Sequence, residues 1–306
     1  MAEIGTDVER AVAVLQAGGL VAIPTETVYG LAADATNDAA VQRIYAAKGR
    51  PTGHPLIVHV PDADGLAGWA AVIPAAAAEL AAACWPGPLT LIVPAAPHVS
   101  RTVTGGRSSV GVRVPAHPLT HELLIRFGGG LAAPSANRFG RVSPTTAAHV
   151  AADLGDGVDY IIDGGPSPVG VESTIVDCTV EPPQVLRPGA ISEEQIAGLL
   201  GAPLAAAAGP SRAPGMLASH YAPAAEVRLV DSVDEAAALA ESLAASDAHA
   251  VRILHDDDLV RFARDLYTTL RAADADGVRT LIAVLPPAAG IGHAIRDRLQ
   301  KAAGPR

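Results

Sequence analysis

The sequence has very little cysteine and very little lysine. Its 306 residues include two cysteines, Cys84 and Cys178, which are too few for a disulfide framework or a cysteine-ligated zinc site. We expect both to be small buried residues. Lys48 is one of two lysines, against 20 arginines. Because arginine fills almost every other basic position, a lysine retained here indicates a site that needs a compact ammonium group.

Long apolar runs and a signal peptide are also absent from the sequence. No run of 18 or more apolar residues occurs, and the alanine-rich segment 75–83 is too short to span a bilayer and contains Glu79. The N-terminus carries Glu3, Asp7 and Glu9 in place of the basic and apolar regions of a signal peptide. We therefore expect a cytoplasmic protein that has no membrane partner.

Aromatic residues and net positive charge are scarce as well. Aromatics make up 3% of the chain and its formal net charge is -10. This composition argues against stable binding to nucleic acid, which depends on basic side chains that neutralise phosphates. Residues 1–208 nevertheless hold 11 of the 22 basic residues, and most of these lie in predicted loops. The distribution predicts a local cationic cavity in an acidic protein.

The first two thirds of the chain alternate between helical and extended patterns. Helices are predicted at 8–16, 75–84, 118–127, 145–152 and 193–200. Strands are predicted at 20–23, 56–60, 89–93, 110–114, 131–133, 160–162 and 174–176. Several of these strands are apolar throughout, which is typical of a sheet covered on both faces. The pattern indicates an α/β or α+β core.

A change of composition near 205–214 separates a second, smaller region. Its predicted strands, at 226–230, 250–254 and 280–285, alternate with predicted helices at 233–245, 258–272 and 293–302. This spacing predicts a small parallel sheet of Rossmann-like α/β type. We therefore divide the chain into a domain at 1–208, a linker at 209–225 and a small α/β domain at 226–306.

Two patterns in the small domain look like ligand sites but have simpler explanations. Gly290-Ile-Gly292 is similar to a dinucleotide-binding turn but lacks the third glycine. The acidic segment 255–258 has the composition of a metal cluster, yet helix capping and solvated charge explain it better.

Five polar clusters interrupt the apolar strands of the first domain. They lie at 24–30, 48–59, 109–113, 133–145 and 170–189. Each cluster alone could be an ordinary turn, a helix cap, a core histidine or a surface arginine. Their joint occurrence favours one ligand site, because open α/β sheets bind ligands where polar groups follow strand ends.

Lys48 has two possible roles. Asn37 and Gly49 are suitable caps for a helix between them, so Lys48 could simply complement the negative end of the helix dipole. Alternatively, the ammonium group could act with the nearby guanidinium of Arg50 to bind phosphate, since phosphate sites often use both groups.

Four motifs resemble those of one family. Pro24-Thr-Glu-Thr-Val-Tyr-Gly30, Lys48-Gly-Arg-Pro51, Pro134-Ser-Ala-Asn137 and Leu186-Arg-Pro-Gly189, in this order, are similar to motifs of the YrdC-like threonylcarbamoyl-adenylate synthases. The match covers about residues 8–205, and the segment 214–223 with the small domain resembles the longer, two-domain branch. The resemblance implies a twisted mixed sheet with a deep positive cavity.

The resemblance also implies a reaction and its partners. L-threonine, bicarbonate and ATP, with Mg²⁺, would give threonylcarbamoyl-AMP and pyrophosphate. This is an adenylyl transfer and the first step toward threonylcarbamoyladenosine beside the tRNA anticodon. The product would be handed over to a tRNA threonylcarbamoyltransferase complex. The sequence has no Walker A motif, so a P-loop does not hold the triphosphate.

The same resemblance assigns site residues. Lys48 and Arg50 would be catalytic. The L-threonine pocket would comprise Thr27, His59, Arg113, Ala133 and Ser173. The ATP contacts would be Lys48, Arg50, His54, Ser109, Ser135, Asn137, Ser143, Arg187 and Tyr221. His54 departs from the asparagine common in the longer branch, and its imidazole could add pH dependence. The metal ligands are not assigned.

The assigned residues suit catalysis by positioning and electrostatics. A carbamate and a triphosphate, both anionic, must meet, and Lys48, Arg50, Arg187 and Mg²⁺ can offset their repulsion. The linker would act as a lid that excludes water.

Two alternatives remain open from the residues. An RNA-binding module could use a similar cationic cavity, although the acidic total and the few aromatics disfavour it. A carbamoyltransferase of the hydrogenase-maturation type would need zinc modules, for which two cysteines are insufficient.

Overall fold

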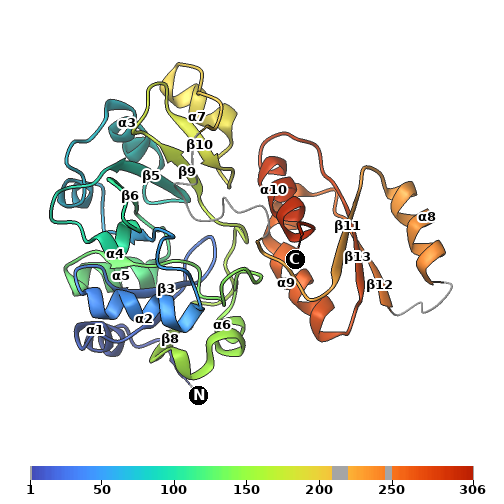
Figure 1. Ribbon diagram of the computed structural model, residues 1–306, viewed down its shortest axis with the longest axis horizontal. Helices are drawn as coiled ribbons and strands as arrows, with labels where there is room; N and C mark the ends of the chain where they lie inside the picture. Colours follow the sequence, from blue (N-terminus) through green and yellow to red (C-terminus); the bar gives the residue numbers. More distant parts are fainter. Residues whose placement is uncertain (1, 209–219, 245–249, 306) are drawn as a thin grey trace.

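The computed structural model describes residues 2–208, 220–244 and 250–305. Most of the expected linker, 209–219, therefore lies outside the described residues. The described chain forms a ten-stranded mixed sheet from the first 187 residues and a separate three-stranded sheet from the C-terminal region. Figure 1 shows the two sheets in two bodies that lie side by side. Within the described residues, no helix combines the length and the apolar character needed to cross a membrane.

The large sheet has the strand order β1-β8-β2-β3-β7-β4-β6-β5-β9-β10. The bounds are β1 Glu3–Gly5, β2 Val21–Ile23, β3 Gly30–Asp34, β4 Ile57–His59, β5 Leu89–Pro94, β6 Ser109–Arg113, β7 Leu131–Ala132, β8 Tyr160–Ile162, β9 Thr174–Asp177 and β10 Gln184–Arg187. Parallel and antiparallel pairs both occur: β4 is parallel to β6 and antiparallel to β7. The sheet is therefore mixed, as the resemblance predicted.

Helices cover both faces of the large sheet. Their bounds are α1 Val8–Gln16, α2 Asp38–Lys48, α3 Ala75–Cys84, α4 Arg101–Thr104, α5 Pro118–Phe127, α6 Ala147–Leu154 and α7 Glu193–Leu200. Val21 packs in one apolar cluster with Leu15 of α1 and Leu123 of α5. Its neighbour Ala22 packs in another cluster with Ile44 of α2. Because successive residues of a strand face opposite sides, apolar residues at both positions confirm a sheet buried on both faces.

Helix α2 ends as the sequence predicts, and its end places Lys48. The Asn37 side chain caps the first turn by accepting a hydrogen bond from the Ala40 backbone N–H. Gly49 ends the helix with a left-handed φ of 60°, a conformation that a residue with a Cβ rarely adopts. Lys48 is consequently the last helical residue, and its side chain is buried.

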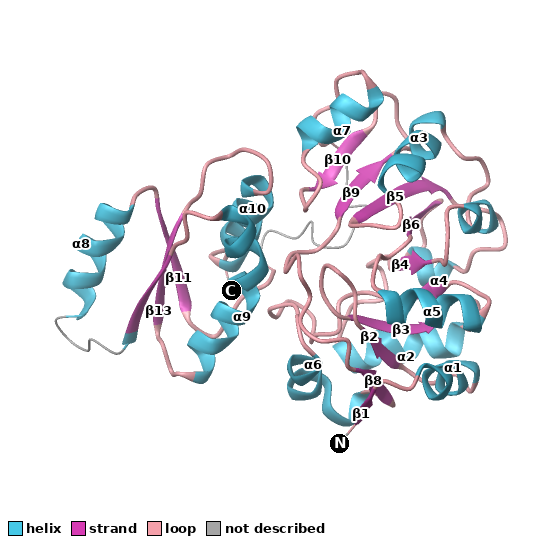
Figure 2. Cartoon of the chain, turned by 180° about the vertical axis from the view of Figure 1, so that it is seen from behind, coloured by secondary structure: helices cyan, strands magenta, loops and turns pink. Residues whose placement is uncertain are grey.

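The three-stranded sheet is entirely parallel, as expected. It comprises β11 Glu226–Val230, β12 Val251–Leu254 and β13 Thr280–Val284, in the order β11-β13-β12. The helices are α8 Val233–Ala244, α9 Leu259–Ala275 and α10 Gly292–Ala302. Figures 1 and 2 show α9 and α10 between this sheet and the larger body, whereas α8 lies on the far side of the sheet.

One apolar cluster joins the two bodies. Val28, Val142 and Val171 from the first body pack with Phe262 and Leu266 of α9. Burial of such side chains is worth about 1.5–3 kcal/mol each. The C-terminal region is thus held against the part of the first body that carries the motif segments.

Three strands of the large sheet, β1, β3 and β10, are not apparent from the sequence. The segment Gly30-Leu-Ala-Ala-Asp34 consists largely of residues with low β propensity. It becomes β3 because β2 and β7 pair with it on its two edges. Cys178 is buried as expected, whereas Cys84 is only partly buried because it ends the surface helix α3.

The acidic segment 255–258 serves as a helix cap, as predicted. Asp258 is the N-cap of α9, and its carboxylate accepts hydrogen bonds from the backbone N–H groups of Val260 and Arg261. Among the described residues, no group of three or more His, Cys, Asp or Glu side chains could hold a metal ion.

Candidate active site

Polar side chains from several separate loops line one cavity of the first body. Residues predicted for both substrates meet there: Thr27, Arg50, His59, Arg113, Ala133, Ser135, Ser173, Arg187 and Tyr221. The predicted residues Lys48, His54, Ser109, Asn137 and Ser143 are not among the lining residues. Among the described lining residues, three arginines and one glutamate, Glu172, give the wall its formal charges.

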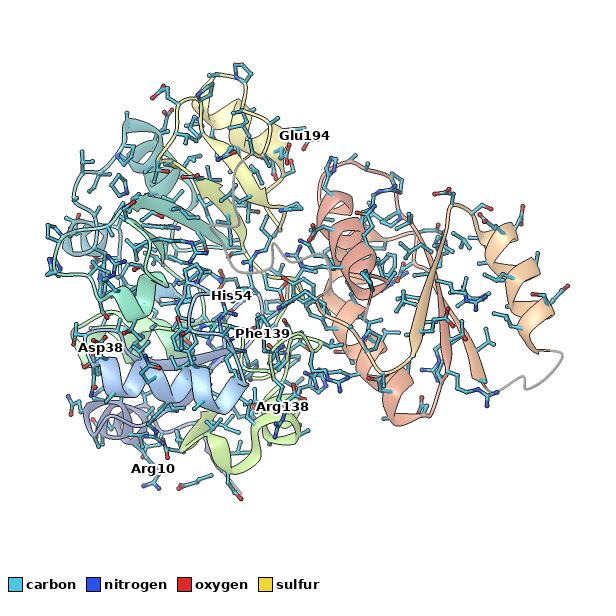
Figure 3. The ribbon with its side chains drawn as sticks, in the orientation of Figure 1. Arg10, Asp38, His54, Arg138, Phe139 and Glu194 are labelled. Carbon is cyan, nitrogen blue, oxygen red and sulfur yellow. The ribbon has the colours of Figure 1, made fainter. Side chains whose placement is uncertain are left out.

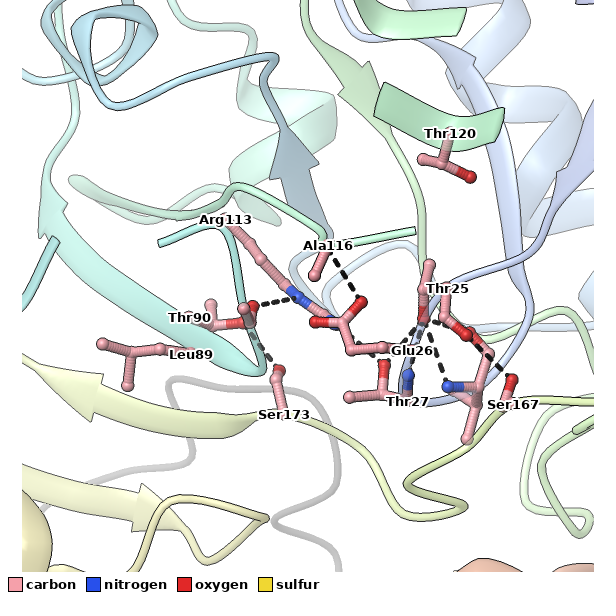
Figure 4. Close-up of polar contacts among 12 residues, drawn as sticks. Thr25, Glu26, Thr27, Leu89, Thr90, Arg113, Ala116, Thr120, Ser167 and Ser173 are labelled. Atoms are coloured by element: carbon pink, nitrogen blue, oxygen red, sulfur yellow. Dashed lines mark hydrogen bonds and ion pairs between the residues drawn. The ribbon is translucent and has the colours of Figure 1, made fainter. Parts of the chain in front are cut away.

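The segment after β2 forms a turn that its own hydroxyl groups stabilise. The Thr25 hydroxyl accepts hydrogen bonds from the backbone N–H groups of Thr27 and Val28, both at 3.2 Å, and donates to the Val28 carbonyl at 2.6 Å. Ser167 donates to the Thr25 carbonyl at 2.9 Å. These contacts, drawn in Figure 4, hold Thr27 at the wall of the cavity.

Arg113 is held by partners from three segments of the chain. Its guanidinium donates to the Glu26 carboxylate at 2.7 Å, to the Thr27 hydroxyl at 3.0 Å and to the Gly87 carbonyl at 3.2 Å (Figure 4). The second oxygen of Glu26 accepts from the Ala116 backbone N–H at 3.1 Å. Three of the five guanidinium N–H donors are thus used, and the arrangement gives the guanidinium a defined orientation.

His59 lies beside Arg113 because β4 and β6 are parallel and in register. These two residues end their strands and are Cα partners. Burial, and secondly the charge of Arg113, lower the pKa of His59 to about 3. The imidazole is therefore neutral at physiological pH, and its Nδ1 has no hydrogen-bond partner among the described residues. It offers a neutral polar contact to a ligand in the cavity.

Ser173 and Arg187 line the cavity together. The Arg187 guanidinium donates to the Ser173 carbonyl at 2.9 and 3.1 Å and to its hydroxyl at 3.0 Å. The Ser173 hydroxyl also lies 2.7 Å from the hydroxyl of Thr90. Gly189 permits this contact between loops, because a Cβ there would lie 2.3 Å from the Thr174 backbone nitrogen.

Lys48 contacts the loop that carries Ser135 rather than the cavity itself. Its ammonium group donates to the backbone carbonyls of Ser135 and Asn137, both at 2.5 Å. Burial, and secondly the charge of Arg50, hold the pKa of Lys48 well below its usual value. The ammonium group therefore supports the Ser135 loop, in addition to any interaction with the dipole of α2.

Arg50 reaches the cavity from the turn that follows α2. Its guanidinium donates to the Pro55 carbonyl at 2.9 Å and lies 5.5 Å from the ring centroid of Phe139. Burial lowers the pKa of Arg50 to about 10, so the group is still protonated at neutral pH. Within the part of the chain that the structure describes, its Nε has no hydrogen-bond partner.

The other predicted ATP contacts are not among the described residues that line the cavity. The ring of His54 packs edge-on against Phe139 at 5.3 Å (Figure 3), and burial lowers the pKa of this histidine. The Asn137 amide donates to the carbonyls of Arg138 and Arg141, both at 2.8 Å. Ser143 donates to Glu172 at 2.5 Å. Ser109 begins β6, four residues before Arg113.

His220 and Tyr221, beyond the undescribed part of the linker, close one side of the cavity. Tyr221 has a left-handed φ of 60°, which is uncommon for a residue with a Cβ. Its ring lies 4.1 Å from that of His220 and 5.7 Å from that of Tyr267, with which it stacks. The cavity volume is only about 50 Å³. Ligand pockets commonly have volumes of about 300–1,000 Å³, so the cavity is too small for a nucleotide in this arrangement.

Sequence reasoning missed four residues of this site. Glu26 lies within a recognised motif, and a carboxylate so soon after the buried strand β2 could have signalled a buried cationic partner. Glu172 lies beside Ser173, a predicted threonine contact, and this position could have signalled a role in the site. His220 was visible in the linker motif but received no role. Arg298 gives no local signal, because its side chain meets the site only through the packing of α10.

Comparisons with known proteins identify the family of the whole chain. Residues 13–189 match a family model described as "Telomere recombination" (Sua5/YciO/YrdC), and residues 191–304 match "Threonylcarbamoyl-AMP synthase, C-terminal domain". A "Threonylcarbamoyl-AMP synthase" of Pyrococcus abyssi is 41% identical, over 95% of this chain and 92% of that protein. One of Bacillus subtilis is 40% identical, over 98% and 93%.

A solved structure supports the same assignment. The structure described as P. abyssi Sua5 complexed with L-threonine has a TM-score of 0.92 and 38% sequence identity, and the match covers 99% of this chain and 97% of that one. The chain therefore belongs to the Sua5/YciO/YrdC family of threonylcarbamoyl-AMP synthases, and it has both domains of the longer form.

Proposed function

We propose that this protein is an L-threonylcarbamoyladenylate synthase. L-threonine and bicarbonate give a threonine carbamate and water, and a carbamate oxygen attacks the α-phosphorus of ATP while pyrophosphate leaves. The observation that carries the proposal is the cavity in which Thr27, His59 and Arg113 meet Arg50 and Arg187. The family membership of the whole chain agrees with it. The reaction is the first step of tRNA threonylcarbamoyladenosine synthesis, and the product passes to a transferase complex.

The half of the cavity around Arg113 would bind L-threonine. The guanidinium keeps two N–H donors beyond its three contacts, which suits a carboxylate. The hydroxyls of Thr27 and Ser173, the neutral imidazole of His59 and the backbone at Ala133 surround it. These groups would orient the amine for addition to bicarbonate.

The half around Arg50 and Arg187 would bind the nucleotide. Within the described residues, Lys48 uses two of its three ammonium donors on carbonyl groups, and the third would donate to a phosphate oxygen once the nucleotide is bound. Ser109, Ser135, Asn137, Ser143, His54 and Tyr221 would complete the nucleotide contacts. The positive groups would stabilise charge on the departing pyrophosphate.

Mg²⁺ would enter as part of the substrate, bound to the triphosphate. Both oxygens of the Glu172 carboxylate are already hydrogen-bonded, and the described residues offer no cluster of carboxylates for a cation. Mg²⁺ in nucleotide sites is commonly held by phosphate oxygens and waters, which agrees with such a donor set.

The mechanism needs no nucleophilic side chain, because positioning and charge are sufficient. His220 and Tyr221 would move aside to admit ATP and would then return to exclude water from the labile adenylate. The small volume of the closed cavity supports such a movement.

A pyrophosphate-release assay tests the proposal. Release from ATP should require both L-threonine and bicarbonate, and mass spectrometry should detect threonylcarbamoyl-AMP. Omission of either substrate is the matched control. Release that is independent of threonine would contradict the proposal, and salt-sensitive tRNA binding without turnover would favour the RNA-binding alternative.

A further inference from the structure

Glu172, at the wall of the cavity, is held by the C-terminal domain. One carboxylate oxygen accepts a hydrogen bond from the Ser143 hydroxyl at 2.5 Å. The other accepts from the Tyr267 hydroxyl of α9 and from Nε of Arg298 of α10, both at 2.8 Å. The Arg298 side chain is 0% exposed and that of Glu172 is 6% exposed. A buried ion pair therefore connects the nucleotide half of the cavity with a helix more than 100 residues away in the chain.

The position of Glu172 poses an electrostatic problem for a nucleotide site. The carboxylate lines the cavity together with Arg187, where the proposed function places the phosphates. An uncompensated carboxylate there would repel the phosphates or compete with them for Arg187. Burial acts to raise the pKa of Glu172, but the charges of Arg298 and then Arg187, with the Ser143 hydroxyl, lower it to about 2. The group is consequently ionised at neutral pH.

Arg298 is suited to compensating this charge because its other contacts fix its position. Its guanidinium donates to the Pro188 carbonyl at 3.1 Å, next to Arg187, and to the carboxylate of Asp297. The guanidinium carbon also lies 5.1 Å from the ring centroid of Tyr221. Arg298 thus contacts the two loops and the linker residue that surround the nucleotide half of the cavity.

We propose that Arg298 is a positioning residue of the C-terminal domain that neutralises Glu172, so that this carboxylate neither repels the phosphates of ATP nor competes with them for Arg187. The C-terminal domain then completes the nucleotide site, although it contributes no phosphate ligand. This inference rests on the proposed function, because it assigns ATP to this half of the cavity.

Calorimetric ATP binding to the full-length protein tests the inference without requiring turnover. Arg298→Gln should weaken ATP binding by about tenfold or more, equivalent to about 1.4 kcal/mol. Glu172→Gln added to Arg298→Gln should restore most of that affinity, because it removes the uncompensated charge. Arg261→Gln is the matched control, since Arg261 is an exposed arginine of α9 that pairs with Asp256. Its ATP affinity should equal that of the wild type.

The variant that combines Arg298→Gln with Glu172→Gln distinguishes charge compensation by Arg298 from a purely structural role of this residue. If Arg298 acted only by docking α10 or by its contact with Tyr221, removal of the Glu172 charge would not restore ATP binding. Failure of the rescue, or wild-type ATP affinity in Arg298→Gln, would therefore overturn the inference.

Glu172→Gln alone provides a test that does not depend on the folding of Arg298→Gln. It leaves the guanidinium of Arg298 in place and should bind ATP at least as tightly as the wild type. A tenfold loss of affinity in this variant would contradict the inference. Absence of ATP binding by the wild type, or of threonine-dependent pyrophosphate release, would instead refute the proposed function.

Discussion

At the scale of single residues, the site consists of buried charges whose partners were only partly predictable. The motifs identified Lys48 and Arg50 at the end of α2, and His59 and Arg113 at the ends of apolar strands. They did not show that Arg113 pairs with Glu26 or that Lys48 binds two carbonyl groups. Such contacts depend on how loops distant in the sequence meet, and local sequence carries no record of that.

Lys48 should matter for both catalysis and stability. Lys48→Met should lower turnover by about a hundredfold or more, because a donor to the transferring phosphates is lost. It should also lower the free energy of unfolding by about 1–3 kcal/mol, because it leaves the buried carbonyls of Ser135 and Asn137 unpaired. Pyrophosphate release and urea denaturation measure the two effects.

The control is Arg43→Met on the same helix, since Arg43 is a partly exposed residue that pairs with Asp159. It should retain wild-type activity. Full turnover in Lys48→Met would show that the ammonium group has no catalytic role.

His59 should make stability depend on pH. Its folded-state pKa of about 3 lies below the unfolded value of about 6.5, so the unfolded chain binds an extra proton between these values. The contribution is complete above about pH 6.5 and is lost as the pH falls toward 3, by about 1.4 kcal/mol per pH unit.

Urea denaturation at pH 7 and pH 5 measures this effect. The loss of stability between the two values should be about 2 kcal/mol smaller in His59→Gln than in the wild type. The exposed His98→Gln serves as the control. An unchanged difference in His59→Gln would show that the imidazole is not held neutral by burial.

At the scale of elements, local signals predicted helices better than strands. The caps Asn37 and Gly49 bound α2 as expected, because capping depends on residues close in sequence. The short strands β3 and β10 were missed, because their residues become strands only through pairing with distant segments. The loop contact at Gly189 was not predicted for the same reason, because it depends on segments that are distant in the sequence.

Gly189→Ala should disturb the nucleotide half of the cavity. The new Cβ would lie 2.3 Å from the Thr174 nitrogen and 2.6 Å from the Glu172 carbonyl oxygen. Because backbone atoms cannot yield easily, the loop should shift and carry Arg187 away from Ser173. We expect weaker ATP binding and a loss of about 1–3 kcal/mol in stability.

Gly198→Ala is the matched control, because a Cβ at this position of α7 meets nothing within 4 Å. It should keep wild-type ATP affinity and gain about 0.5–1 kcal/mol from reduced backbone freedom. Equal calorimetric ATP affinity in Gly189→Ala and the wild type would show that the loop contact is dispensable.

At the scale of the whole molecule, the C-terminal domain is part of the site rather than an appendage. Tyr267 and Arg298 contact Glu172, and the apolar cluster at Val28, Val142 and Val171 is completed by α9. The division of the chain at 208 and 225 describes the order of segments, and we propose it as an organisation of domains. This division does not imply that either domain forms the complete site by itself.

Truncation after Ala208 should affect the binding of the two substrates differently. The partners of Arg113, namely Glu26, Thr27 and Gly87, all precede the cut, so L-threonine binding should persist. ATP binding should weaken by about tenfold or more, because Glu172 loses Arg298 and Tyr221 is removed. Calorimetry with each ligand, after circular dichroism to verify folding, checks this. Retained ATP affinity would show that the domain is not needed for the site.

The sequence by itself determined the helices other than α4, the parallel small sheet, the family motifs and the residues expected to meet the substrates. These features depend on periodicity, caps and short motifs, which are local. The tertiary structure decided which charges face each other: Glu26 with Arg113, and Glu172 with Arg298. Burial makes those pairings obligatory, because an unpaired charge in the interior is too costly, yet only the packing of distant segments selects the partner.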